Sequence, residues 1–431
     1  MSHRFMVSLV ATALLALPAF SQDPGASKAV TLPPANSGAS KPDTAAPANA
    51  DTATGVNPIE SPLLANIEHE NQVPGFGAGL WFSADYEFAW IKGTPLPPLV
   101  TTSPAGTAQA NAGVLGKSTT TILLGDEQVD SGIRAGMSLD AGYWFNPEQT
   151  LGIQTGFRML ESQSQPFGFT SNGTTILARP FTDANTSQPV ALLIGYPGVS
   201  SGSVTVVPTS HNFQGFHIDM EEQFNCSKFV RLEGIVGYRY YRYDEDLDIN
   251  ETMNPTSGAF VPGTVIQVND HFGTKNEFNG GEFGLRTKIF FLDRLSLEVL
   301  TQVDAGQMTR EVTIAGRTTV SVPGATPTVS SGGLLALSSN IGNYTSDKWV
   351  AIPEIGAILG WQITPNVKFK FGYSFLSLSQ VARPGDQIDL TVNQTLLPNN
   401  GPASGPSRPA FTLHTSDVWV QSLNLGLEFS F

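Results

Sequence analysis

One pair of residues in this chain has the types and spacing of an acid–base or metal-binding site. His217 and Asp219 are separated by one residue, so on an extended strand both side chains project from the same face. A histidine held by a carboxylate could form half of a hydrolytic site. Because no nucleophile can be assigned beside the pair, the sequence favours an ion pair with a structural role.

Two other patterns match motifs only in part. Gly198–Gly202 reads G-x-S-x-G, but no helical pattern follows it, as a nucleophile elbow requires. Asp244, Asp246 and Asp248 alternate like calcium ligands, but Ile249 stands where an EF-hand needs glycine. Solvated loop carboxylates are the favoured interpretation, and a loose surface cation site is the alternative. We therefore expect no enzymatic activity, no cofactor and no metal site.

Composition narrows the class of protein. The chain has 431 residues, of which 14% are charged and 40% hydrophobic. It lacks a run of roughly 18 apolar residues, the length that a membrane helix needs. The formal charge of −14 argues against nucleic acid as a partner. The lone cysteine, Cys226, cannot form a disulfide within the chain and is expected to be incidental.

The N-terminus predicts export. His3 and Arg4 precede an apolar run that ends at Pro18, and Ala19-Phe20-Ser21 follows with a small-x-small pattern. This is the layout of a cleaved signal peptide, assigned to residues 1–21. Residues 22–70 are rich in Ala, Pro, Ser, Thr, Asn and Asp, so we expect a disordered periplasmic tail there.

From residue 77 onward, apolar and polar residues alternate with a period of two, which is typical of strands. The ten alternating runs are 80–90, 133–145, 151–159, 216–221, 230–240, 282–291, 295–304, 349–363, 367–375 and 419–431. Closed strands with this alternation can span a bilayer. The pattern predicts an all-β fold over residues 77–431, a transmembrane antiparallel up-and-down β-barrel of about ten strands, with twelve as the alternative.

One face of each run carries most of the ionic groups. A Lys or Arg at the lipid midplane costs roughly 2–4 kcal/mol, so this face should point inward, where acids and bases can pair. The charged residues predicted to face the lumen, as the lining of a pore, are Asp85, Glu87, Arg134, Asp140, Arg158, Asp219, Arg231, Glu233, Glu282, Arg286, Glu298, Glu354 and Lys370. The acidic excess suggests a mild cation preference.

The connections between runs alternate between short and long. Short turns are expected at 146–149, 225–227, 292–294 and 364–366, and long loops at 93–130, 162–211, 244–274, 306–347 and 380–415. Outer-membrane barrels have short periplasmic turns and long extracellular loops. Apolar loop residues such as Leu177, Phe181 and Leu334 favour loops that pack together over the barrel mouth.

Several loop phrases are shared with a known family. They are Leu96–Pro104, Gly142–Phe145, Ile176–Phe181, Gly332–Leu337 followed by Ser339–Gly342, Arg383–Asp389 and Arg408–Phe411. With these phrases, residues 77–431 resemble the putative beta-barrel porin family numbered seven. The resemblance implies an outer-membrane barrel with a presumed pore. A C-terminal Phe431 resembles the signal that such barrels present to the barrel assembly machinery.

Three functions follow as hypotheses. The first, favoured through the resemblance, is a porin that passes small solutes or ions through a narrow charged lumen. The second is a closed structural or adhesive barrel acting through its extracellular loops, because eight-stranded barrels fill with side chains and open channels appear near 16–18 strands. The third and last is an outer-membrane hydrolase. Outer-membrane lipid is an expected partner, and a homo-oligomer is an open alternative.

Overall fold

The structure is a computed structural model that describes residues 79–129, 132–227, 229–258, 260–292, 294–398 and 400–431. The predicted signal peptide (1–21) and tail (22–70), as well as the side chain of Cys226, lie outside what it describes. Within the described ranges, no helix has the length and apolar character to cross a membrane.

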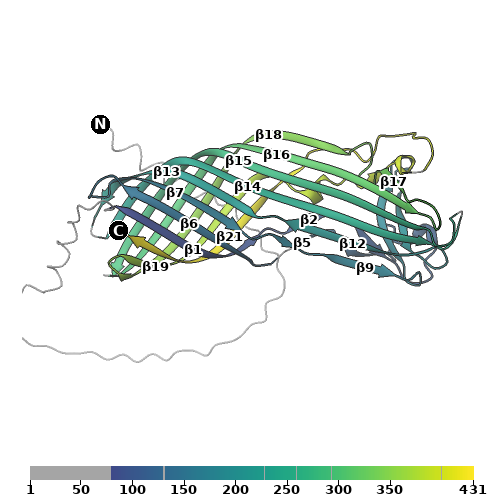
Figure 1. The fold of residues 1–431 in the computed structure, drawn as a ribbon, viewed down its shortest axis with the longest axis horizontal. Coiled ribbons are helices and arrows are strands. Elements are labelled where there is room, and N and C mark those ends of the chain that lie inside the picture. Colours follow the sequence, from purple (N-terminus) through teal and green to yellow (C-terminus); the bar gives the residue numbers. More distant parts are fainter. Residues whose placement is uncertain (1–78, 130–131, 228, 259, 293, 399) are drawn as a thin grey trace, which may run out of the picture. The chain divides into compact units, whose positions relative to one another are not determined.

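Ten antiparallel strands close into a ring (Figure 1). They are β1 (Leu80–Ile91), β6 (Arg134–Trp144), β7 (Leu151–Leu160), β13 (Phe213–Cys226), β14 (Val230–Pro255), β15 (Val265–Leu292), β16 (Leu295–Ser321), β18 (Gly342–Thr364), β19 (Val367–Ala382) and β21 (Thr415–Ser430). Each pairs with the next along the chain, and β21 pairs with β1 to complete the ring. The predicted all-β barrel of about ten strands is confirmed.

The register places apolar and ionic residues on opposite faces, as the alternation predicts. Phe283 lies opposite Val236 and Val303, and all three are exposed on the outside of the ring. The neighbouring Glu282 lies opposite Asp304, and both side chains are fully buried. Because successive strand residues point to opposite faces, this register fixes the orientation of every other residue on these strands.

Short turns join the strands at one end of the ring. Residues 145–150 connect β6 to β7, and the Asn146 side chain accepts hydrogen bonds from the backbone N–H of Thr150 at 2.9 Å and of Leu151 at 3.3 Å. Residues 365–366 connect β18 to β19. Strand β1 begins and β21 ends at this same end, since Trp81 lies opposite Ser430. An even number of strands requires this arrangement.

Strands β14, β15 and β16 are the longest and, with β18 (23 residues), extend beyond the rest of the ring, and here the predicted loop bounds are wrong. β14, β15 and β16 have 26, 28 and 27 residues, so most of 244–274 and part of 306–347 are strand (Figure 1). From Glu245 onward β14 leaves β13 and pairs with β12 (Ser200–Ser210). The Asp244–Asp248 run therefore lies on a strand, where its aspartates alternate with inward-facing Glu245 and Leu247.

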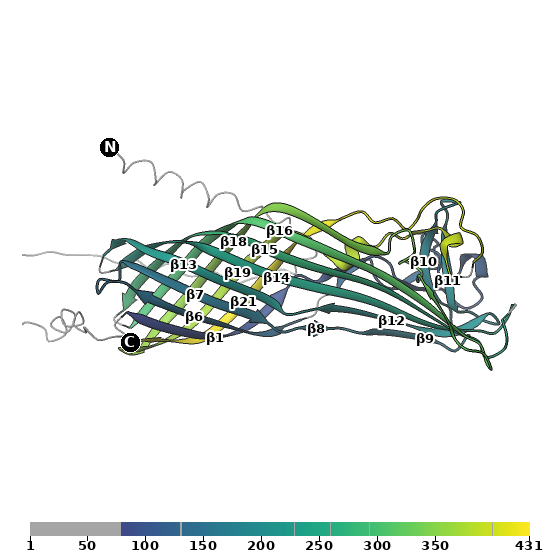
Figure 2. The ribbon, with the colours of Figure 1, turned by 45° about the horizontal axis from the view of Figure 1, so that its top comes forward.

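The long connections 92–133, 161–212, 322–341 and 383–414 fold with these extensions into a compact unit that we call the cap (Figure 2). Its elements are β2 (Thr94–Leu96), β3 (Val100–Thr102), η1 (Gln109–Asn111), β4 (Thr121–Leu124), β5 (Glu127–Val129), β8 (Gln163–Ser164), β9 (Phe167–Ser171), β10 (Leu177–Asp183), β11 (Pro189–Gly195), β12, β17 (Thr328–Ser331), η2 (Pro384–Gln387), β20 (Thr391–Val392) and η3 (Gln394–Leu396). Strands β11, β10, β3 and β4 form a separate sheet, with β20 beside β10.

A hydrophobic core holds the cap together. Leu177 and Phe181 of connection 161–212 and Leu334 of connection 322–341 are at most 5% exposed and pack with Leu247 of β14 and Phe272 of β15. Burial of each such side chain stabilises the fold by about 1.5–3 kcal/mol. The prediction that the loops pack together is confirmed.

The outward apolar face predicts a sharp difference between two phenylalanines. Phe283→Arg should destabilise the barrel in lipid by roughly 2–4 kcal/mol, because Phe283 is in the middle of the exposed apolar band and 58% exposed. Phe260→Arg, at a 50% exposed position in the cap, should cost well under 1 kcal/mol. Urea titrations of the protein folded into vesicles measure both, and equal costs would contradict a lipid-facing band.

Candidate functional site

The part of the lumen nearest the short turns contains a cavity of about 750 Å³. Residues of the short-turn end line it, including Gly79, Leu80, Pro365 and Phe431. Ten of the thirteen charged residues predicted for the lumen also line it: Glu87, Asp140, Arg158, Arg231, Glu233, Glu282, Arg286, Glu298, Glu354 and Lys370. The cavity thus has its opening at the end where short turns join the strands.

The other three predicted residues lie close by. Asp85 forms an ion pair with Lys370 at 2.8 Å, and Asp219 contacts His217, which lines the cavity. Arg134 is buried nearer the cap, where it donates a hydrogen bond to Ser210 at 2.9 Å.

The expected acidic excess does not lie in this cavity. Its carboxylates are Glu87, Asp140, Glu221, Glu233, Glu282, Glu298, Glu354 and Glu428, and its Lys and Arg side chains are Arg158, Arg231, Arg239, Arg286, Lys288, Arg294, Lys368 and Lys370. Eight acids therefore face eight bases. The lining itself therefore carries no acidic excess, and the additional buried carboxylates of Asp85 and Asp219 lie just outside it.

Three arginines connect the carboxylates into networks. Arg158 pairs with Glu87 at 2.8 Å, and Arg239 pairs with Glu282 at 2.8 Å. Arg286 pairs with Glu221 at 2.6 Å, with Glu298 at 3.1 Å and with Glu233 at 3.4 Å. Removing one partner of a buried pair typically costs 3–5 kcal/mol, so the network also fixes the positions of its members.

Sequence reasoning omitted several members of these networks. Arg239, Lys288 and Glu221 were not among the predicted lumen residues, although their parity on β14, β15 and β13 places them on the ionic face. The alternation was thus a sufficient signal for them. The pairing of Arg286 with residues from three other strands depends on the register between β13, β14, β15 and β16, which alternation does not encode.

Above the cavity, an apolar layer that we call the seal crosses the barrel. It consists of Ala89, Ile91, Leu160, Phe213, Tyr241, Tyr243, Phe278, Met308, Val350, Ile352, Leu376, Leu378, Val381, Val418 and Val420. Nine of the ten ring strands contribute to it, and each of these residues is at most 9% exposed. Phe213 packs on Tyr241 with ring centroids 5.7 Å apart, and Tyr241 packs on Phe278 at 6.0 Å. Tyr241 belongs both to the seal and to the cavity lining, so the seal adjoins the cavity.

In the cap, a buried arginine joins one connection to two strand extensions. Arg179 of β10 pairs with Asp270 of β15 at 2.8 Å and with Glu251 of β14 at 3.3 Å. The second oxygen of Asp270 accepts backbone hydrogen bonds at 2.9 Å from Leu334, Leu335 and Ala336. One carboxylate therefore anchors both 161–212 and 322–341.

A second buried arginine anchors the connection 383–414. Arg383 binds both carboxylate oxygens of Glu245, at 2.8 and 2.7 Å, and also donates to the Gly93 carbonyl at 2.6 Å. Its side chain and that of Glu245 are each 1% exposed. The phrases Ile176–Phe181 and Arg383–Asp389, noted in the sequence, thus contain the two arginines that fix the cap.

Three histidines lie beside carboxylates, in two places. His217 contacts Asp219 through Nδ1 and lies 3.1 Å from Asp140 through Nε2. His211 lies 2.6 Å from Asp246, and His271 lies 3.0 Å from Asp248, both on the outside of the barrel. In the G-x-S-x-G segment, strand β12 begins at Ser200, and the Ser200 hydroxyl donates a hydrogen bond to the Leu193 carbonyl. The segment is therefore not a strand-to-helix elbow.

Comparison with known proteins supports the resemblance noted in the sequence. The family model described as "Putative beta barrel porin-7" matches residues 81–431. No curated protein matches the sequence.

Solved structures are similar only at a distance. The alignment with outer membrane protease OmpT from Escherichia coli covers 84% of this chain and 100% of the OmpT chain, at 9% identity and a TM-score of 0.39. Neisserial surface protein A covers 83% with 100% of its own, at 8% identity and a TM-score of 0.20. The toluene transporter TodX from P. putida covers 82% with 90% of its own, at 7% identity and a TM-score of 0.22. Similarity this low has no bearing on the activity of the chain.

Arg383→Met should loosen the cap. The substitution leaves Glu245 buried without its cation, and we expect a local loss of about 3–5 kcal/mol. Arg408→Met is the matched control, because the Arg408 side chain is 47% exposed in its pair with Asp389, where a loss of about 0–1 kcal/mol is expected. Hydrogen exchange of the backbone amides of 384–392 measures the loss of local stability in each variant. Equal protection in the two variants would contradict the anchoring role.

The cap should also respond to pH through Glu251. Burial raises the pKa of Glu251 from 4.5 to about 7, against the opposing charge of Arg179. The folded cap therefore binds a proton that the unfolded chain releases, and this stabilisation is lost as the pH rises from 4.5 through 7. Hydrogen exchange of β10, corrected for intrinsic rates, should show greater stability at pH 5 than at pH 8. Glu251→Gln should remove that difference, and a difference unchanged in this variant would exclude Glu251 as its source.

Proposed function

The chain belongs to the family described as putative beta barrel porin-7. We propose that it is an outer-membrane barrel whose lumen is closed at rest. The barrel would act at the cell surface through its cap. The single observation that carries the proposal is the seal. A charged or strongly hydrated solute would have to leave water to cross it, and burial of an unpaired charge is strongly unfavourable. Hydrophobic constrictions of this kind stop conduction by excluding water.

The construction of the cap supports a surface role. Arg179 and Arg383 fix its connections to β14 and β15, and one hydrophobic core runs through all four of them. Loops that only surrounded a pore would not need this rigidity. An ordered surface held away from the membrane suits structural or adhesive contact.

Passage of small solutes or ions is the second candidate. The charged cavity of about 750 Å³ favours it, because half of a conduction path is already present. In that case the seal would be a gate. We do not expect enzymatic activity, since His217 is surrounded by carboxylates and arginine side chains.

Single-channel recording in planar bilayers tests the closed state. The unmodified protein should show no conductance steps, whereas Phe213→Ser with Phe278→Ser should weaken the seal and admit ions. The matched control carries Phe216→Ser and Phe283→Ser, on the same strands but on the exposed outer face. Regular conductance steps in the unmodified protein would contradict the closed barrel and establish the pore.

The surface role requires the cap to lie outside the cell. With Cys226 replaced by serine, a cysteine at Phe260 should react with a membrane-impermeant maleimide on intact cells, because this residue is exposed at the end of the β14–β15 hairpin. A cysteine at Asn146, in the β6–β7 turn, should react only after the outer membrane is opened. The reverse pattern would place the cap in the periplasm.

A further inference from the structure

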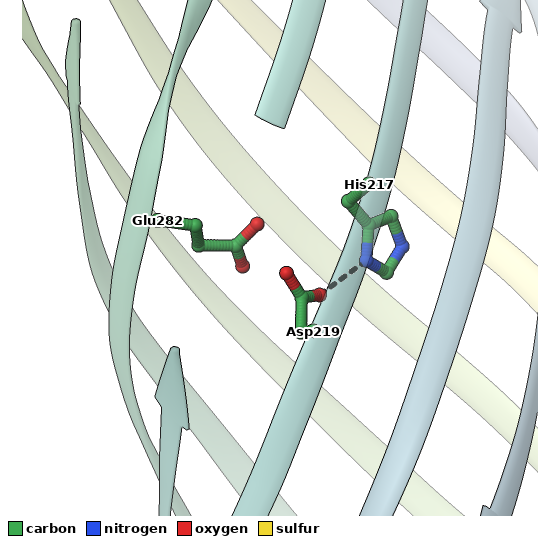
Figure 3. A group of neighbouring side chains, drawn as sticks. All are labelled: His217, Asp219 and Glu282. Carbon is green, nitrogen blue, oxygen red and sulfur yellow. Dashed lines mark hydrogen bonds and ion pairs between the residues drawn. The ribbon is translucent and has the colours of Figure 1, made fainter. Parts of the chain in front are cut away.

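One histidine meets three carboxylates inside the lumen, and the pairing of β6, β7, β13, β14 and β15 brings them together from different strands. On β13, His217 and Asp219 face inward, and their contact is drawn in Figure 3 with the carboxylate of Glu282 of β15 turned toward them. The ligand-capable atoms of His217, Asp219 and Glu282 all lie within 4.8 Å of one another. In the other direction along the ring, across β7, His217 Nε2 lies 3.1 Å from Asp140 of β6.

Two glycines make room for this group. Gly156 lies opposite both Asp140 and His217, and a Cβ there would come within 2.1 Å of each side chain. Gly237 lies between Asp219 and Glu282, and its Cβ would come within 2.0 Å of Asp219 Oδ1. Since glycine weakens a strand interior, both positions indicate space kept for the side chains beside them.

The group has more negative than positive charge. Asp219 is 1% exposed, and Glu282 and Asp304 are 0% exposed. The cation in direct contact with Glu282 is Arg239, which also lies 3.9 Å from Asp304. Asp219 Oδ1 is buried against the carboxyl group of Glu282, and among the described residues no N–H group donates to it. A buried carboxylate oxygen with no such donor is costly, so a further cation would stabilise the group.

We propose that His217, Asp219 and Glu282 bind one divalent transition-metal ion of the Zn²⁺ type. A mixed set of imidazole nitrogen and carboxylate oxygen suits such ions, and three protein ligands leave one position for water. Asp140 would accept the Nε2–H of His217 and so direct the Nδ1 lone pair at the metal, as carboxylates commonly do for metal-binding histidines. When Glu282 turns to the metal, Asp304, which lies 3.9 Å from Arg239, can replace Glu282 as the ion-pair partner of Arg239.

The site has a route for the ion. His217, Asp140 and Glu282 line the cavity, whose mouth is at the short-turn end. The ion can therefore enter without crossing the seal. The ion can reach the site whether or not the barrel conducts, because the site lies on the cavity side of the seal.

Isothermal titration of the folded, chelator-treated protein in detergent with ZnCl₂ tests the proposal. We expect one Zn²⁺ per chain, loss of saturable binding in His217→Gln and in Asp219→Asn, and about 10–100-fold weaker binding in Asp140→Asn. The matched control is His211→Gln with Asp246→Asn, which removes another histidine–aspartate pair, at 2.6 Å on the outer face, and should leave binding unchanged. Heat-modifiable gel mobility shows whether each variant is folded.

A second measurement needs no variant. X-ray absorption at the zinc edge of the unmodified, Zn²⁺-loaded protein should show one imidazole nitrogen among oxygen ligands. A shell of oxygens alone would overturn the proposal, as would binding that survives His217→Gln but is lost in the His211 control. Absence of saturable binding in the unmodified protein would also overturn it.

Discussion

The exclusion of charge from the lipid-facing side of the ring is the constraint on which the rest of the structure depends. Once side chains such as Phe283, Val236 and Val303 occupy that side, the intervening residues must point inward. The lumen of a ten-stranded ring is narrow, so acids and bases placed there come within pairing distance. The networks around Arg158, Arg239 and Arg286 are the result.

The same strands reverse their polarity where they leave the lipid. Along β14 the inward residues change from Glu233 and Arg239 to Tyr241 and then to Leu247 and Ile249. The outward residues change in the opposite sense, from Val236 and Tyr238 to the aspartates at 244, 246 and 248. Water outside the membrane permits a conventional core, so one continuous strand contributes to the ionic lumen, the seal and the cap in turn.

This reversal explains which parts of the structure the sequence could predict. Period-two alternation is a local property, so it identified the ring strands and the inward orientation of Glu282 and Arg286. Around Asp246 and Leu247 the alternation continues with the opposite polarity, so a pattern with apolar residues outward predicts a loop there. The contacts of Arg383 with Glu245 and Gly93 join distant parts of the chain and leave no periodic signal. The alternation also does not predict the seal. Each of its members is an ordinary inward-facing strand residue, and the apolar layer forms only where nine strands meet in the ring.

A scan of spin labels along β15 tests the orientation of the strands most directly. Labels placed one at a time at positions 282 to 286, in the protein folded into vesicles, would be compared for collision with oxygen, which dissolves in lipid, and with a water-soluble nickel chelate. We expect strong oxygen collision at 283 and 285 and weak collision at 282, 284 and 286. A uniform response, or stronger access to the nickel chelate at 283 and 285, would contradict the account.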